Sequence, residues 1–144
     1  MKRELQNSIK AMMAIDPVSL ATTGNNAGRK IDRRGYGGVE FLVSYGSIST
    51  TGTNNPVVVK EGDTTGAMTS VADADLVGTE TLAGLLAQTP RTSGVSRNVT
   101  KRIGYKGSKR YVSIDIGHTG PTSAGIVAAA AVLFNPESAP VSNP

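Results

Sequence analysis

The apolar and polar positions of this chain alternate with a period of two over several short segments. The clearest case has apolar Val112, Ile114 and Ile116 separated by polar Ser113 and Asp115. Successive side chains of a strand point to opposite faces of a sheet. The pattern therefore predicts a strand with one buried face and one face exposed to water.

Four further segments predict strands. Residues 39–45 alternate in the same way, residues 57–61 are rich in β-branched side chains, and residues 97–105 place apolar side chains between basic ones. Residues 126–134 contain four consecutive alanines, which favour a helix by propensity. Their β-branched and aromatic flanks and the preceding Gly-Pro-rich turn favour a strand, which we prefer. Small residues on both faces would allow a second sheet or another subunit to approach closely.

Other segments are less regular. Residues 72–76 predict a short helix or turn, and residues 81–87 fit either a helical turn or a strand. Residues 88–98 are rich in turn-forming residues and predict a long exposed loop. Loops of this length in small domains often carry function or bind partners.

The N-terminal segment follows a different period. Leu5, Ile9, Met12 and Met13 are spaced as one face of a helix, which predicts a helix within residues 1–15. An isolated helix of this length is marginal in water, so it needs a surface on its own domain or on a neighbouring subunit. A frayed terminus is the alternative.

Together these segments predict an all-β fold. We expect an antiparallel β-sandwich, jelly-roll-like, with an extended or helical N-terminal arm and an extended C-terminal tail. The arm and linker would occupy residues 1–28, the sandwich residues 29–135 and the tail residues 136–144.

Composition narrows the chemistry. The 144 residues fit one domain, and the absence of Cys excludes disulfides, thiolate catalysis and Cys-based zinc sites. The chain has one His, so a histidine-rich metal site within one subunit is excluded. No apolar run is long enough for a membrane span, and polar residues interrupt any signal peptide.

No catalytic constellation is present. Asp73 and Asp75 lack the glycine and the later Glu of a calcium loop and are expected in a turn or helix cap. Neither GxGxxG after a strand nor GxSxG occurs. His118 lies in a Gly-Pro-rich turn and is expected at the surface. We therefore expect no cofactor and no enzymatic activity.

A basic stretch precedes the clearest strand. Its cations are Lys101, Arg102, Lys106, Lys109 and Arg110, with Tyr105 and Tyr111 between them. A solvated β-hairpin is the simplest interpretation, and contact with an acidic protein surface is the second. Nucleic acid is a weaker third: cations neutralise phosphates and tyrosines stack on bases, but aromatic residues make up 4% of the chain and the net charge is only +4.

Three phrases together resemble a family of small proteins of tailed bacteriophages and prophages, typically encoded near the major capsid protein. They are IDRRGYGGVEFLV at residues 31–43, VADADLVGTE at 71–80 and KRIGYKGSKRYV at 101–112. The likeness spans residues 31–142. Residues 61–66 form a shorter turn than the family pattern has, and residues 81–98 form a longer segment.

The resemblance implies a virion component on the capsid surface, a decoration (cement or minor capsid) protein that binds the major capsid protein. A homo-oligomer, with a trimer favoured, would supply multivalency. The expected partner contacts are Leu5, Ile9, Met12, Met13, Lys101, Arg102, Lys106, Lys109 and Arg110. A head–tail junction or tail component is the alternative in the same virion, and a nucleic-acid-binding module is the alternative of another class.

Overall fold

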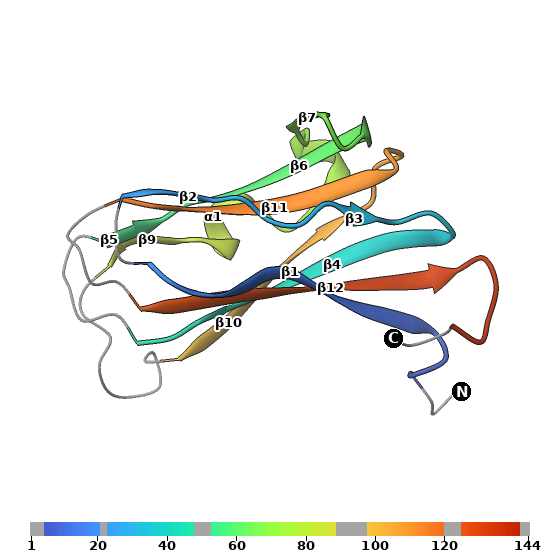
Figure 1. Ribbon diagram of the computed structural model, residues 1–144, viewed down its shortest axis with the longest axis horizontal. Coiled ribbons are helices and arrows are strands. Elements are labelled where there is room, and N and C mark those ends of the chain that lie inside the picture. Colours follow the sequence, from blue (N-terminus) through green and yellow to red (C-terminus); the bar gives the residue numbers. More distant parts are fainter. Residues whose placement is uncertain (1–4, 21–22, 48–52, 89–97, 120–124, 142–144) are drawn as a thin grey trace.

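Two antiparallel sheets packed face to face make up this protein (Figure 1). The structure, a computed structural model, describes residues 5–20, 23–47, 53–88, 98–119 and 125–141. The predicted all-β antiparallel sandwich is confirmed.

Sheet A has five strands. In spatial order they are β1 (Ile9–Ser19), β12 (Ile126–Pro136), β4 (Tyr36–Tyr45), β10 (Val99–Tyr105) and β8 (Leu76–Val77). Sheet B contains β2 (Gly24–Asn26), β11 (Tyr111–His118), β6 (Val57–Thr64) and β7 (Ala67–Ser70), and β3 (Ile31–Asp32) also pairs with β11. A small third sheet joins β5 (Thr53–Asn55) to β9 (Leu85–Gln88).

The helical content is small. The 3₁₀ turn η1 (Asp73–Asp75) lies where residues 72–76 predict a short helix or turn, so that prediction is confirmed. Residues 81–87 contain both elements considered for them: α1 (Glu80–Ala83) ends within this segment and β9 begins in it. None of the helices in the described ranges is long and apolar enough to span a membrane.

The core fills the space between the two sheets. Phe41, Val43 and Ile103 of sheet A and Ile114 and Ile116 of sheet B are all fully buried. Burying a side chain of this size contributes about 1.5–3 kcal/mol. The apolar positions of the alternating segments therefore lie where the sequence pattern predicts.

The alanine-rich segment is the strand β12, as preferred from its flanks. It pairs with β1 on one side and with β4 on the other. Ala129 and Ala131 face the core opposite Val43 and Phe41. A strand forms despite the helix propensity of alanine, because ladders on both edges satisfy the backbone hydrogen-bonding groups of β12.

Of the two forms expected for the N-terminal arm, the helix predicted within residues 1–15 is wrong for residues 5–15, and the extended form holds for residues 9–15; residues 1–4 lie outside the described residues. Residues 9–19 form the strand β1, which is paired with β12. The pairing shifts register after Met13 and again after Ile15, and these irregularities break the period of two. Ala14 and Ile15 belong to the core, so this part of the predicted arm is a strand of the sandwich.

The water-exposed face predicted for β11 is also wrong. Ser113 and Asp115 are buried. The Asp115 carboxylate lies 2.7 Å from the Lys60 ammonium and accepts hydrogen bonds from the Gly28 amide (3.1 Å) and the Asn25 side chain (3.3 Å). These donors satisfy the buried charge.

The segment between β2 and β3 explains why Asp115 is covered. After Asn26 the chain leaves its ladder with β11. Arg29, which follows Gly28, then donates its amide to the Ala14 carbonyl of β1 (2.8 Å). A Cβ atom at Gly28 would lie 2.1 Å from the Ile114 carbonyl oxygen. The segment therefore requires glycine where it passes from its ladder with β11 to its contact with β1.

His118 lies in the interior rather than at the surface, which corrects the prediction for it. It ends β11 and is fully buried with Asn55, whose side-chain amide lies 3.3 Å from its Nδ1. Its Nε2 has no hydrogen-bond partner in the described part of the chain. This histidine belongs to the packing between β5 and β11.

We predict that Asp115→Asn lowers the free energy of unfolding at pH 7 by about 3 kcal/mol, because it leaves Lys60 without its counter-charge. The matched control Asp63→Asn removes an exposed partner of Lys109 and should cost less than about 1 kcal/mol. Urea unfolding of the three proteins measures both effects. Equal losses in the two variants would contradict this assignment.

The same carboxylate should make stability depend on pH. Burial alone would raise the pKa of Asp115, but the hydrogen bonds from Lys60, Gly28 and Asn25 outweigh it and lower that pKa. The contribution of the ionised Asp115 carboxylate to the free energy of unfolding is complete above the unfolded-state pKa of about 3.9. It disappears as the pH falls through the lower folded-state pKa. Unfolding curves between pH 7 and acid should show a smaller loss in Asp115→Asn than in the wild type.

Candidate functional site

The outer face of sheet A is the main candidate for binding a partner. Directly paired residues of antiparallel strands share a face, so the register identifies its members. We define the apolar face of sheet A by β1 residues Ile9, Ala11 and Met13, β4 residue Leu42, and β12 residues Ile126, Ala128, Ala130, Val132 and Phe134. Outward positions of an antiparallel sheet are ordinarily polar. Here every outward residue of β12 from 126 to 134 is apolar.

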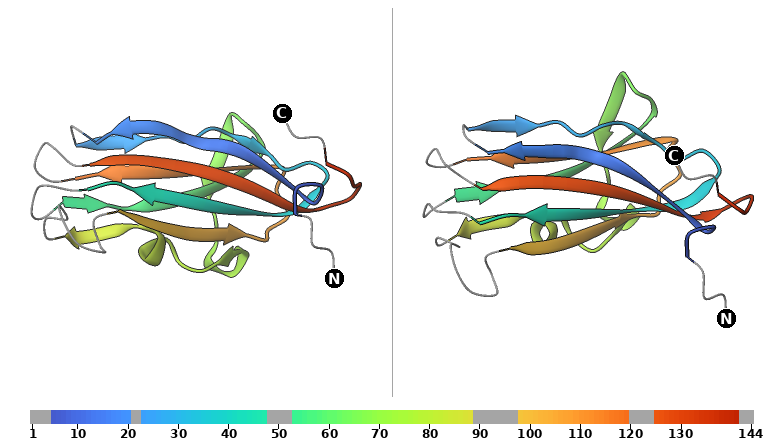
Figure 2. Two further views of the ribbon diagram at one scale, coloured as in Figure 1. Left: turned by 90° about the horizontal axis from the view of Figure 1, so that it is seen from below. Right: turned by 60° about the horizontal axis from the view of Figure 1, so that its bottom comes forward.

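This face is open to solvent. Met13, Ile126 and Phe134 are 44%, 59% and 41% exposed. Figure 2 shows sheet A from its outer side, and no described helix or strand lies over it. A continuous exposed apolar surface is typical of a contact with another molecule.

Polar residues border the apolar face along β4 and β10. Glu40 and Arg102 lie on the same outer side, with 3.9 Å between the carboxylate and the guanidinium. Burial against neighbouring side chains raises the pKa of Glu40, and the charge of Arg102 opposes this shift. The pair adds a hydrogen-bonding border to a mainly apolar surface.

The predicted N-terminal contact residues divide between two faces. Ile9 and Met13 belong to the apolar face, opposite Phe134 and Ala130 of β12. Met12 points to the other side and packs against the core. Leu5 precedes β1 and is exposed. A helix would have placed all four on one side, whereas the strand separates them.

The basic residues predicted as one contact surface are separated in the same way. Lys101 points inward and donates to the carbonyls of Leu82 and Gly84 at the end of α1 (3.0 and 2.9 Å). Arg102 points outward beside Glu40. Lys106 is exposed in the turn between β10 and β11.

Lys109 and Arg110 are paired with acids of the same chain. Lys109 lies 2.6 Å from Asp63, and Arg110 holds Asp32 through two guanidinium nitrogens. The hydrogen bond from Arg110 is the main reason that the pKa of Asp32 is lowered. These two cations therefore stabilise the turn more than they offer free charge.

The tyrosines of the basic stretch are not free platforms for bases. Tyr105 is buried, and its hydroxyl contacts Glu61 and the Lys109 amide. The Arg110 guanidinium lies over the ring of Tyr111, with 4.8 Å between its central carbon and the ring centre. Stacking on nucleic acid requires exposed aromatic faces, so this geometry disfavours that alternative.

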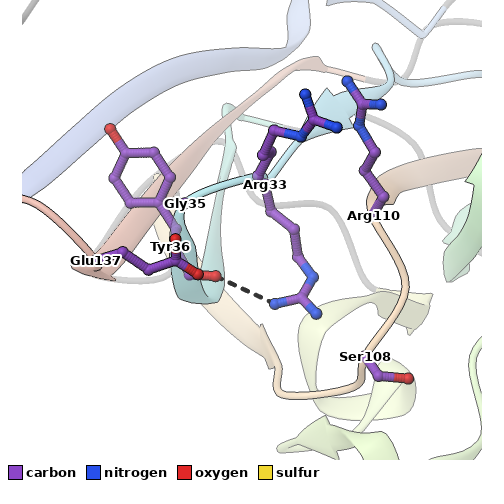
Figure 3. Close-up of a pocket in the computed structure, with 7 residues that line it drawn as sticks. Arg33, Gly35, Tyr36, Ser108, Arg110 and Glu137 are labelled. Carbon is purple, nitrogen blue, oxygen red and sulfur yellow. Dashed lines mark hydrogen bonds between the residues drawn. The ribbon is translucent and has the colours of Figure 1, made fainter.

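A basic hollow of about 330 Å³ lies beside this turn, and the sequence analysis missed it (Figure 3). We define the basic hollow by its lining residues Arg33, Arg34, Gly35, Tyr36, Ser108, Arg110 and Glu137. The available signal was the Arg-Arg-Gly sequence at residues 33–35, which places two cations in a tight turn; Gly35 has a φ of 84°. Only the fold brings this turn beside Arg110.

No cluster of three or more metal-ligating side chains occurs within the described residues. The expectation that the chain uses no cofactor and is not an enzyme remains a prediction. The surfaces with recognisable chemistry are the apolar face of sheet A and the basic hollow.

No protein-family model matches the sequence, and no curated protein matches it either. Solved structures do match. The SPBc2 prophage-derived protein YomS is 11% identical with a TM-score of 0.52, over 88% of this chain and 93% of YomS. The PBSX exported protein XepA is 15% identical with a TM-score of 0.55, over 92% of this chain and 39% of XepA.

At these identities the likeness shows a shared fold. The protein thus shares an all-β sandwich fold with these two proteins. The virion role that the sequence resemblance implies goes further than a shared fold and is a proposal.

We predict that Gly38→Ala lowers the free energy of unfolding by about 1 kcal/mol, because a Cβ there would lie 2.4 Å from Cζ of Phe134. In the Phe134→Ala background this cost should disappear, since the ring that it meets is gone. Urea unfolding of the single and double variants measures the coupling, with Gly66→Ala, which meets no atom within 4 Å, as the control. Strictly additive costs would show that Phe134 does not cover Gly38.

Proposed function

We propose that this chain is a structural virion protein of a tailed bacteriophage that binds and stabilises the capsid lattice through the apolar face of sheet A. The observation that carries the proposal is the unbroken apolar outward side of β12, over which no helix or strand of the described residues lies. The shared fold with phage-derived proteins and the sequence resemblance support the virion context. The proposed partner is the major capsid protein.

The energetics favour repeated attachment. Burying large side chains such as Ile126, Met13 and Phe134 yields about 25 cal/mol per Å² of apolar surface. Association costs several kcal/mol in lost rigid-body freedom, so one small face binds weakly. A homo-oligomer, with a trimer proposed, would engage several lattice sites together and multiply the affinity. On this proposal the protein acts by binding and not by catalysis.

The copy number in the virion tests the role. A decoration protein follows the capsid lattice, so cryo-electron microscopy should place hundreds of copies on the shell. About six or twelve copies at one vertex would instead assign the protein to the head–tail junction. Density along the tail would likewise contradict the proposal.

We predict that Met13→Glu weakens binding to capsids of the cognate major capsid protein by about tenfold or more. The substitution places an unpaired charge in the apolar contact, and about 1.4 kcal/mol corresponds to tenfold in affinity. The control Met68→Glu makes the same exchange on β7 of sheet B. Co-sedimentation measures both, and circular dichroism confirms folding. Equal capsid binding by the two variants would disprove the role of the apolar face.

A further inference from the structure

The basic hollow lies where two turns of the sandwich meet the segment that follows β12. Arg33 and Arg34 belong to the turn between β3 and β4, Arg110 ends the turn between β10 and β11, and Glu137 follows β12 (Figure 3). Its lining carries three guanidinium groups and one carboxylate, that of Glu137. An excess of cations at a concave site favours an anionic ligand.

Arg33 is held in place without being neutralised. Its Nε donates to the Lys109 carbonyl and its Nη1 to the Tyr36 carbonyl (3.2 Å), the bond that is dashed in Figure 3. Its guanidinium lies 5.4 Å from the centre of the Tyr105 ring. These groups fix the side chain, but no carboxylate of the described residues forms an ion pair with it. The remaining N–H donors are available to a ligand.

Arg34 adds a second guanidinium that no carboxylate of the described residues contacts directly. Its side chain is exposed and forms no hydrogen bond or ion pair with the described residues, although its backbone amide donates to Asp32 and its charge contributes to lowering the pKa of that carboxyl group. Arg110 differs, because its guanidinium is engaged by the Asp32 carboxylate. The ligand-binding charge of the basic hollow therefore comes from Arg33 and Arg34.

A second hollow of about 360 Å³ adjoins the first, with Gly35, Tyr36 and Glu137 shared between them. It is further lined by Lys10, Pro136, Ser138, Pro140 and Val141. The two adjoining hollows thus form one path along the surface. It begins at the guanidinium groups of the basic hollow and continues along a tyrosine, two prolines and a valine. A lone inorganic anion would use only the first part of this path, whereas an extended peptide can use all of it.

We propose that the basic hollow binds carboxylates of an extended acidic polypeptide segment. Arginine suits this ligand because its planar fork matches a carboxylate in a two-point contact. The assignment of the segment to a capsid subunit rests on the proposed function, but the chemistry of the site does not. Arg33 supplies a pre-positioned contact, Arg34 an exposed second one, and the adjoining hollow accommodates neighbouring apolar side chains.

The test uses the full-length isolated protein and fluorescein-labelled hexaglutamate, with binding followed by fluorescence anisotropy at low salt. Arg34→Gln should weaken binding about threefold to fivefold, the range of one exposed charge pair. Arg29→Gln, which removes the same charge from an exposed site outside the basic hollow, should leave the affinity nearly unchanged. Glu137→Gln should tighten binding, because it removes the carboxylate that competes with the peptide.

Three outcomes would overturn the proposal. Equal affinities for Arg34→Gln and Arg29→Gln would show a nonspecific charge effect. Amide NMR shifts induced by hexaglutamate away from residues 33–36 and 108–110 would place the site elsewhere. Tighter binding of inorganic phosphate or of labelled oligothymidylate, lost in Arg34→Gln, would assign the hollow to phosphate or nucleic acid.

Failure of this site is distinguishable from failure of the proposed function. If Met13→Glu abolishes capsid binding while Arg34→Gln leaves the affinity for hexaglutamate unchanged, the basic hollow is not a carboxylate site and the capsid role stands. If hexaglutamate binds at Arg34 but Met13→Glu binds capsids as well as Met68→Glu does, the apolar face is rejected and the basic hollow stands.

Discussion

The position of β12 inside sheet A, between β1 and β4, is the constraint on which the rest of the structure depends. This strand is apolar on both sides and pairs with β1 and β4 along both edges. In a two-layer sandwich the opposite sheet covers only one face of each sheet. The inward residues of β12 therefore enter the core and its outward residues stay in contact with water. The apolar face of sheet A is the direct consequence: the interaction that stabilises the fold also leaves a surface suited to a partner.

The connections between the sheets produce the second surface. Strands β3 and β4 lie in different sheets, as do β10 and β11, so their turns meet at one end of the sandwich instead of closing hairpins. Acids from other elements, Asp32 and Asp63, pair with Arg110 and Lys109 in this region. The guanidinium groups without a direct carboxylate partner among the described residues, those of Arg33 and Arg34, belong to the turn between β3 and β4. An apolar sheet face and a cationic hollow would act on a partner in complementary ways, one through buried area and one through orientation.

Local pattern predicted most of the strands because apolar periodicity reflects burial directly. It failed where apolar side chains lie on both faces of a strand or where both faces are covered. In β1 the apolar spacing resembled that of a helix because Ile9 and Met13 belong to the apolar face of sheet A while Met12 packs against the core. In β11 the polar residue Asp115 suggested a face exposed to water, but Lys60 and the segment around Gly28 cover it and donate hydrogen bonds to its carboxylate.

The sequence by itself determined the all-β class, the presence of strands within residues 39–45, 97–105 and 111–116, and the absence of cysteine chemistry, because these depend on composition and on neighbours along the chain. Only the tertiary structure decided which surfaces are free. It separated Met12 from Met13, paired Lys109 and Arg110 with distant acids, and left Arg33 without a carboxylate partner among the described residues. The physical reason is that exposure and charge compensation depend on contacts between residues far apart in the chain.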